Sequence, residues 1–369
     1  MKTEMIQFMA GAAILSAFTY VPILARDYLG ADEFYVTVLV AGYATAALVS
    51  SYIFGRAGDI HGRRIVLRIG LLIAALSFAM LMLVQDETTL FVVRVINGFA
   101  VGMHPGALAA YAYDSHMPMG RFASFGALGW GVGTFLTGIA ATQDIYSAFA
   151  LSSLFFVVAF ASALTLPPVD RVRVRVPLFP IETLKRNFAV YAAVFIRHSS
   201  AFAIWTLWPL FLSDLGADLF TIGIVQAANS ISQVVFMLTI TDRIECSRLI
   251  SVGLLASAAT FMSFTLVSSV LEILPSQTLL GFSWACLYVG SLKYVTQKNV
   301  ERSTASGLLS SVLSIAGVFG PIYASVLYLL WPGYHAILMF AVAMSLFAFV
   351  LFRFSDPSAT PKLVSDVRE

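Results

Sequence analysis

A short polar stretch stands out in a chain that is otherwise apolar. Residues 54–70 read FGRAGDIHGRRIVLRIG and hold six ionisable side chains, Arg56, Asp59, His61, Arg63, Arg64 and Arg68. Arg56 and Arg68 can be explained as bases that anchor the end of a helix at the membrane surface. Such anchoring would not account for an acid placed between two glycines, as Asp59 is between Gly55 and Gly62. The stretch therefore predicts a function beyond anchoring.

A second set of polar side chains lies within long apolar segments, where such groups are costly and are functional candidates by default. At 100° per residue, Asn97, His104 and Tyr111 share the helix face of Arg94. Stripes at helical spacing recur at residues 226–233 and 277–291, and Arg197 is followed by His198. The substrate-binding candidates are Arg94, Asn97, His104, Arg197, Trp205, Gln226, Asn229, Gln277, Trp284 and Tyr288.

The balance of charge in these segments favours one class of solute. No Asp or Glu falls deep within an expected span, whereas Arg94 and Arg197 do. Buried guanidinium groups without an acid favour an anionic or carbonyl-rich solute. His104 and His198 are the proton-coupling candidates, because an imidazole titrates near neutral pH. Structural alternatives stay open: Arg94 can bond backbone carbonyls, each histidine can bond a neighbouring helix, and the 226–233 stripe can face another helix.

The composition points to a membrane protein. Of the 369 residues, 59% are hydrophobic and 11% are charged, whereas soluble domains carry about 25% charged residues. The net charge of +2 is too small to suggest a nucleic-acid partner. Cys246 and Cys286 lack companions at metal-ligand spacing, so we expect neither a metal nor a cofactor.

Apolar runs of membrane length recur along the whole chain. They predict an all-α integral membrane protein with twelve transmembrane helices in two pseudo-symmetric six-helix bundles. The helices are expected near residues 5–25, 34–55, 66–84, 89–112, 121–140, 145–166, 189–212, 219–240, 249–270, 272–293, 304–330 and 333–353. The expected domains are an N-terminal bundle (1–166), a linker (167–188), a C-terminal bundle (189–355) and a tail (356–369).

The distribution of Lys and Arg predicts the orientation in the membrane. With the N-terminus in the cytoplasm, every one of the 22 Lys and Arg except Arg26, Arg94 and Arg197 falls in a cytoplasmic connection or tail. Such a bias marks the inner side of the membrane. We therefore expect a multi-pass protein of the plasma membrane with both termini in the cytoplasm.

The chain also repeats itself. LGADEF at 29–34 is matched by LGADLF at 215–220, and a proline precedes each copy. Arg121 and Gly126 are matched by Arg302 and Gly307 at nearly the same separation along the chain. Two matches in the same order favour a duplicated set of six helices. Internal repeats of this kind are typical of secondary transporters, which bind substrate between the repeats near the bilayer midplane.

The polar stretch and its surroundings resemble a known family. Gly55, Asp59, Gly62, Arg63 and Arg64 follow the pattern G-x-x-x-D-x-x-G-R-R, which resembles the signature loop of the major facilitator superfamily between helices 2 and 3. A second likeness follows in helix 4, where Arg94, Gly98 and Gly102 are spaced as R-x-x-x-G-x-x-x-G. The stretch RHSSAFAIWTLWPLFL is similar to archaeal members. The family's usual base at position 60 is replaced by isoleucine.

The resemblance implies roles for particular residues. It places Asp59 near the start of helix 11, around residues 304–307, where a helix N-terminus stabilises a carboxylate. Arg63 or Arg64 would then bridge to Asp114. The cytoplasmic gate is thus expected to comprise Gly55, Asp59, Gly62, Arg63, Arg64 and Asp114. The resemblance also implies that helices 1, 4, 7 and 10 line the central cavity.

These observations predict a secondary active transporter that moves a small organic solute, with anions favoured, by rocker-switch alternating access coupled to protons. The partners expected are a small-molecule substrate, the lipid bilayer and protons, and the protein is expected to be a monomer. The alternative is a multidrug efflux antiporter, although helix 5 lacks the Gly-Pro pair of that branch. A non-transporting sensor ranks lower. An enzyme is not expected, and the chain has no G-x-x-x-x-G-K-[ST] loop for an ATP-driven pump.

Overall fold

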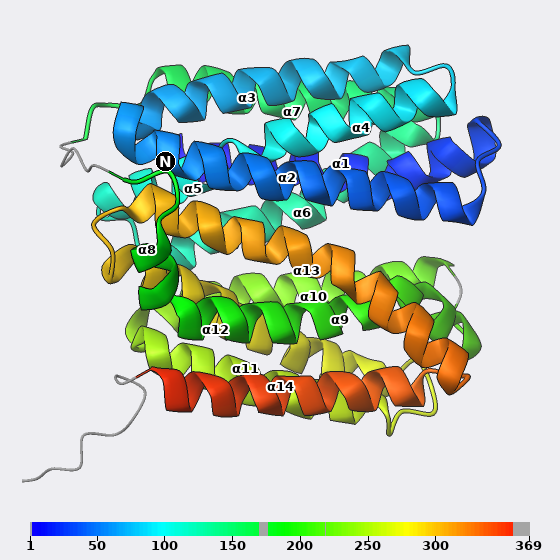
Figure 1. Ribbon diagram of the computed structural model, residues 1–369. Coiled ribbons are helices and arrows are strands. Elements are labelled where there is room, and N and C mark those ends of the chain that lie inside the picture. Colours follow the sequence, from blue (N-terminus) through cyan, green and yellow to red (C-terminus); the bar gives the residue numbers. More distant parts are fainter. Residues whose placement is uncertain (1, 170–175, 218, 357–369) are drawn as a thin grey trace, which may run out of the picture.

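Two bundles of long helices lie side by side in the computed structural model, which describes residues 2–169, 176–217 and 219–356 (Figure 1). The first bundle contains α1 (Lys2–Ile23), α2 (Glu33–His61), α3 (Arg63–Ala79), α4 (Glu87–Gly102), α5 (Pro105–Asp114), α6 (Met119–Ala141) and α7 (Ile145–Leu164). The second contains α9 (Phe188–Asp214), α10 (Leu219–Thr239), α11 (Cys246–Phe264), α12 (Ile273–Gln297), α13 (Arg302–Leu330) and α14 (His335–Ser355). The short helix α8 (Ile181–Arg186) connects them.

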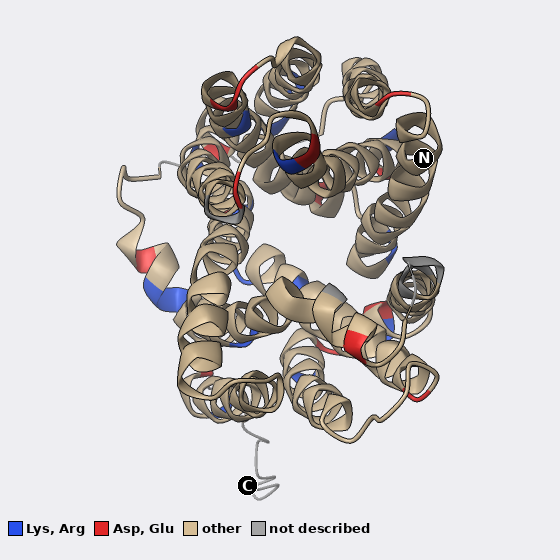
Figure 2. Cartoon of the chain, turned by 90° about the vertical axis from the view of Figure 1, so that its right-hand side faces the viewer, with Lys and Arg blue, Asp and Glu red and all other residues tan. Residues whose placement is uncertain are grey.

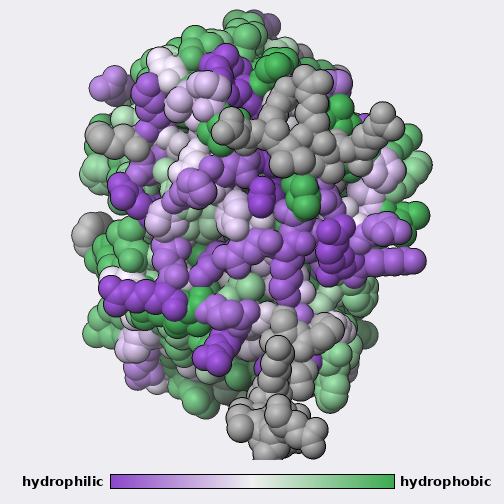
Figure 3. Space-filling view, turned by 90° about the vertical axis from the view of Figure 1, so that its left-hand side faces the viewer, coloured by the Kyte–Doolittle hydropathy of each residue, from purple (hydrophilic) through white to green (hydrophobic). Residues whose placement is uncertain are grey.

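The helices have the length and composition that a bilayer demands. Among the described residues, eleven helical segments are long and apolar enough to cross a membrane. The remaining long helix, α12, has 25 residues but is more polar, and most of its side chains are buried. Figure 3 shows hydrophilic residues across the end of the molecule that carries α8, here called the linker end. The fold is that of an all-α membrane protein of twelve spans in two bundles.

Several helices begin at an acidic cap. Asp32 accepts a 2.7 Å hydrogen bond from the Tyr35 N–H at the start of α2. At the start of α4, Asp86 accepts a 2.8 Å hydrogen bond from the Thr89 N–H, and this bond lowers the pKa of Asp86. At the start of α11, the Glu245 carboxylate accepts hydrogen bonds from the N–H groups of Ser247 and Arg248. Each cap satisfies backbone donors that the helix leaves unpaired.

The structure corrects several expected helix boundaries. The fourth span is not one helix over 89–112, because α4 ends at Gly102 and α5 begins at Pro105. A proline ring removes a backbone donor and clashes with the preceding turn, so the helix restarts there with proline at its first position. The second span extends beyond residue 55 to His61, and the ninth ends at Phe264 instead of 270. Part of the linker is helical as α8.

Small residues allow the helices to approach closely within each half. A Cβ added at Gly129 would lie 2.1 Å from the Phe8 carbonyl oxygen, and one at Gly133 would lie 2.4 Å from Ala12 Cα. These glycines bring α6 against α1. Packing of this kind substitutes for the hydrophobic effect, which does not act between helices in lipid.

Candidate functional site

The acid of the polar stretch joins the two bundles at the linker end. Asp59 lies in the last turn of α2, and only 5% of its surface is exposed. Its carboxylate accepts hydrogen bonds from the N–H groups of Ser303 (3.2 Å) and Thr304 (2.7 Å) and from Thr304 Oγ1 (2.7 Å). These donors form the first turn of α13, where the helix carries partial positive charge. The carboxylate therefore binds the N-terminus of a helix in the other bundle.

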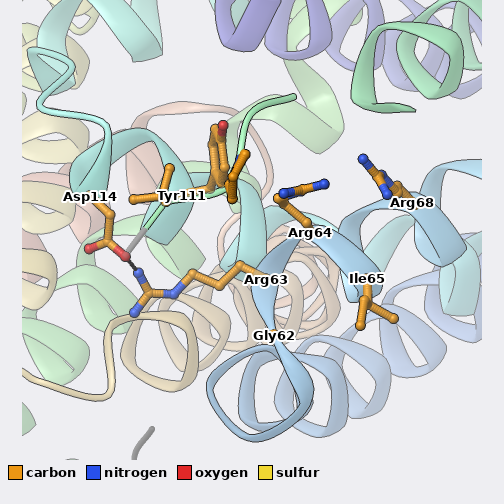
Figure 4. A pocket seen from close by; sticks show the side chains of 9 residues that line it. Gly62, Arg63, Arg64, Ile65, Arg68, Tyr111 and Asp114 are labelled. Carbon is orange, nitrogen blue, oxygen red and sulfur yellow. Dashed lines mark ion pairs between the residues drawn. The ribbon is translucent and has the colours of Figure 1, made fainter. Parts of the chain in front are cut away.

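A cluster of charged side chains extends this contact. Arg63 donates to Asp59 at 3.2 Å and forms an ion pair with Asp114 at the end of α5 (Figure 4). Arg302, in the first turn of α13, pairs with the other oxygen of Asp114 at 3.1 Å. Arg302 also lies over the Tyr113 ring, 4.8 Å from its centroid. We call Asp59, Arg63, Asp114, Arg302 and the first turn of α13 the α2–α13 latch.

The arginine of the latch that the sequence interpretation missed is Arg302. Its position was visible as the counterpart of Arg121 in the repeat, but no local motif marks it. Arg64, by contrast, makes no ion pair with Asp114. It lines a cavity of about 310 Å³ together with Arg68 and Tyr111, and its Nε has no partner among the described atoms (Figure 4). Arg68 donates to the carbonyls of Ala163 and Leu164 at the end of α7.

The glycines of the polar stretch serve two different needs. A Cβ at Gly55 would lie 2.9 Å from both Gly307 Cα and the Ser303 carbonyl oxygen, so this glycine lets α2 contact α13 backbone to backbone. Gly62 has φ of +112°, which side chains rarely adopt, and it alone separates α2 from α3. Asp59 and Arg63 are consequently on helices and not in a loop.

A second contact between the halves mirrors the first. Asp242, which follows α10, accepts hydrogen bonds from the N–H groups of Gly120 (2.8 Å) and Arg121 (3.2 Å) at the start of α6. We call this contact the α10–α6 latch. Lys293 of α12 donates to the Thr241 and Ile244 carbonyls beside it. An acid from the second span of each half therefore caps the fifth span of the other half.

In the second bundle, the structure brings together a buried arginine and several aromatic rings. Arg197 of α9 is 2% exposed, and its Nε donates to Ser257 Oγ at 2.8 Å. The guanidinium carbon lies 5.2 Å from the Phe261 ring centroid and 5.5 Å from that of Trp284. One terminal nitrogen, Nη2, has no hydrogen-bond partner among the described atoms. The group thus retains donor capacity for an anion or a carbonyl.

Three stacked rings lie next to this arginine. The His198 and Trp284 rings stack with centroids 4.8 Å apart and an interplanar angle of 16°. Trp284 stacks in turn on Tyr288, at 5.3 Å and 15°. Tyr288 lines a small cavity of about 40 Å³ between the bundles, together with Gln7, Pro105 and Ser306. We call His198, Trp284 and Tyr288 the aromatic stack. Trp205 lies apart from it, edge-on to Trp208 at 5.3 Å.

The polar residues of the first bundle are separate from this cluster. Arg94 lies over the Tyr43 ring of α2, 4.2 Å from its centroid. Asn97 is fully buried, and neither polar atom of its side chain has a partner among the described atoms. His104 packs edge-on against Phe156 of α7 at 5.9 Å, within the bundle. These positions bring Arg94 and His104 against helices of their own half.

The stripe on α10 faces α12. Asn229 Nδ2 donates to the Gln277 carbonyl at 3.4 Å, and Gln233 donates to Asn229 at 2.5 Å. Gln277 Nε2 has no partner among the described atoms, whereas Gln226 is exposed. The predicted substrate residues therefore fall into separate groups, of which the one around Arg197 combines a donor with stacked rings. Among the described residues, no group of three or more His, Cys, Asp and Glu could hold a metal ion.

Comparison with known proteins decides the family. The model of the Major Facilitator Superfamily matches residues 5–196 and again residues 190–369, one match for each half. The chain belongs to the major facilitator superfamily. This superfamily membership, the membrane-spanning helices and the transporter relatives together make the protein a transmembrane transporter.

Relatives within the superfamily share about a quarter of their aligned residues with this chain. The chain is 25% identical to the class B tetracycline resistance protein of Escherichia coli, over 83% of this chain and 82% of the relative. It is 26% identical to multidrug resistance protein 1 of Bacillus subtilis, over 84% and 86%. The quinolone resistance protein NorA of Staphylococcus aureus is 29% identical over 37% of this chain and 38% of NorA.

Solved structures of the superfamily have the same fold. The human organic anion transporter MFSD10 (TETRAN) superposes with a TM-score of 0.79 at 16% identity, covering 95% of this chain and 99% of that one. The proton:xylose symporter XylE superposes with a TM-score of 0.75 at 14% identity, covering 96% and 94%. At these identities the likeness establishes the two-bundle fold alone.

Proposed function

We propose that the protein is a secondary active transporter of planar, aromatic organic anions or carbonyl-rich compounds, working by alternating access with its linker end in the cytoplasm. The observation that carries the proposal is the buried guanidinium of Arg197, with a free donor at Nη2, beside the aromatic stack. A guanidinium group binds carboxylates and carbonyl oxygens through its fixed fork of donors. Rings stack on an aromatic face with centroids about 4.5–7 Å apart.

The latches support the alternating-access part of the proposal. Both join the bundles at the linker end, so in this structure that end is closed. Opening toward the cytoplasm requires Asp59 and Asp242 to leave the helix N-termini that they cap. A substrate or proton that binds more tightly to the open state than to the closed state can shift the balance between the two.

Proton coupling is assigned in this proposal to His198. It lies beside Arg197, stacks on Trp284, and its Nδ1 has no partner among the described atoms. Protonation next to a guanidinium group is favoured when an anion occupies the site between them, which would link substrate binding to proton uptake. His104, the other candidate, packs against Phe156 within the first bundle and is the weaker choice.

Drug efflux is the second candidate function. The tetracycline and multidrug resistance proteins align over more than four fifths of this chain. A stack of rings at mid-depth suits flat hydrophobic drugs as well as flat anions. The two candidates differ in charge preference, because only an anion or a carbonyl group would depend on Arg197.

Ligand-induced thermal stabilisation separates the two candidates. We expect aromatic carboxylates to raise the melting temperature of the purified protein, and Arg197→Ala to abolish that rise. Arg94→Ala removes the other buried arginine, so it is the matched control and should keep the ligand response. If lipophilic cations alone stabilise the protein, and Arg197→Ala responds to them as the parent does, the anion proposal is wrong and cationic drug efflux replaces it.

A further inference from the structure

The linker segment, residues 176–187, presents large apolar side chains that no other part of the described chain covers. Leu178 is 63% exposed, Phe179 72%, Ile181 55% and Leu184 42%, and Phe188 at the start of α9 is 57% exposed. Large apolar side chains that are exposed at the polar end of the molecule indicate an interaction site. None of these residues belongs to the latches or to the cluster around Arg197.

The helical geometry of this segment sorts its side chains into three faces. Ile181 and Leu184 are three residues apart on α8 and lie toward the same side of that helix, whereas α8 ends before Asn187 and Phe188 is the first residue of α9. Thr183 and Asn187 are buried against the bundle. Glu182 and Lys185 are exposed on the flanks of the apolar face. The segment is thus amphipathic, and its large apolar side chains are exposed.

Hydrogen bonds fix the linker segment to both bundles. Arg56 of α2 donates to the carbonyls of Val176 (3.0 Å) and Pro177 (2.9 Å), and Tyr52 donates to that of Leu178. On the other side, Thr183 Oγ1 and Arg186 donate to Glu301, which directly precedes α13, at 2.8 and 2.7 Å. The segment consequently crosses the seam that the α2–α13 latch closes (Figure 1).

The position of the segment points to lipid as the occupant. Figure 2, which looks along the bundle, shows α8 projecting sideways from the ring of long helices, on the outside of the molecule. Ile53 and Val49, on the part of α2 that leads up to the contact with the linker, are also exposed. The linker sequence 167–187 carries five bases and two acids. Apolar side chains flanked by bases are typical of segments that lie in the surface of an anionic membrane.

We propose that the linker segment docks on the bilayer surface at the linker end, with Leu178, Phe179, Ile181, Leu184 and Phe188 among the acyl chains and Lys185 at anionic phospholipid headgroups. Docking would hold the segment in place over the α2–α13 seam. The bilayer would therefore play two roles for this protein. Its interior surrounds the membrane helices, and its surface binds the linker segment.

Fluorescent labelling at two neighbouring positions tests the proposal. In the full chain with Cys246→Ser and Cys286→Ser, bimane is attached either at Ile181→Cys, on the apolar face, or at Glu182→Cys, the matched control on the polar flank. The proteins are reconstituted into phosphatidylcholine vesicles with or without phosphatidylglycerol, and with bromine near the top of the acyl chains. We expect a blue-shifted emission that is quenched by bromine at position 181, and neither change at position 182.

The dependence on lipid charge provides a second measurement. Phosphatidylglycerol should increase the quenching at position 181, and Lys185→Gln should reduce that increase without unfolding the helix, because the side chain is exposed. Equal, unquenched emission at both positions would overturn the proposal. So would quenching that depends only on the density of protein in the vesicle, since a second copy of the chain would then be the occupant.

Discussion

At the scale of single residues, the carboxylate of Asp59 is held by several hydrogen bonds. It receives three hydrogen bonds from the first turn of α13 and one from Arg63, while almost none of its surface is exposed. Hydrogen bonds to a charged group contribute about 1.5–3 kcal/mol each. We therefore expect an acid at this position to set how stable the closed state of the linker end is.

Asp59→Asn tests this role directly. The amide keeps the shape of the side chain but removes the charge, and its NH₂ group faces the N–H donors of Ser303 and Thr304. We expect a loss of at least ~1.4 kcal/mol from the closed state, which is a tenfold shift toward the open one. Pulsed EPR between labels at His61→Cys and Val300→Cys, both exposed at the linker end, should show a longer distance.

The control for this variant is Asp86→Asn, which removes a helix-capping acid at the opposite end of the bundle. It should leave both the label distance and transport unchanged. Asp59→Asn should reach the membrane in normal amounts and transport poorly. Full transport by Asp59→Asn with an unchanged distance would show that the carboxylate does not control opening.

At the scale of the elements, the latch depends on helices whose backbones touch. A Cβ at Gly307 would lie 2.5 Å from the Ser51 carbonyl oxygen and 2.8 Å from Gly55 Cα. Gly106 of α5 meets the same turn of α13, with its own Cβ position 2.9 Å from Gly307 Cα. The break before α5 brings this glycine to the meeting point of α2, α5 and α13.

Gly307→Val should open the linker end without changing any charge. Forcing the three carbon atoms of an isopropyl group into this contact costs about 1–3 kcal/mol in the closed state, whereas the open state has no such contact to lose. Gly131→Ala is the control, because its new methyl group would meet only Ser230 Cβ at 3.8 Å. We expect slower transport and a longer linker-end distance for Gly307→Val alone. Equal transport rates and equal linker-end distances in the two variants would argue that the backbone contact at Gly307 does not stabilise the closed state.

The helices could be predicted from the sequence because each is a long apolar run bounded by charged or turn residues. Charge bias and the repeated LGAD motif likewise predicted two halves. The interruption at residues 103–104 was missed because Met103 continues the apolar run and His104 falls on the helix face of Arg94, so only Pro105 marks the restart. The exact domain boundaries and the cytoplasmic position of the termini stay predictions.

The site was less predictable, because its contacts join residues far apart in the chain. The motif identified Asp59, but the pairing of Asp114 with Arg302 depends on how two halves dock. Helical spacing placed Arg94 and His104 on one face, yet it could not tell a face that meets α2 or α7 from one that meets the other bundle. The stacking of His198 on Trp284 likewise needs the packing of α9 against α12.

At the scale of the whole molecule, the duplicated halves close the linker end through two related contacts of unequal strength. The carboxylate of Asp59 is bound by the α13 turn and by Arg63, whereas that of Asp242 receives only the N–H groups of Gly120 and Arg121 among the hydrogen bonds of the described residues. The second half also lacks the glycines of the polar stretch, reading TDRIECSR at 241–248. The second half therefore has the acid that caps a helix, and Arg248 after it, but not the glycines.

This inequality leads to a prediction about combined variants. Asp242→Asn alone should lengthen the distance across the α10–α6 seam by less than Asp59→Asn lengthens the distance across the α2–α13 seam. The reason is that the Asp242 carboxylate accepts fewer hydrogen bonds than the Asp59 carboxylate. The two latches share no residue, but a rigid-body rotation of the bundles must break both. The free energy by which the double variant shifts the equilibrium toward the open state should therefore be the sum of the shifts of the two single variants. A double variant no more open than Asp59→Asn alone would mean that the halves hinge about the α10–α6 latch instead of separating there.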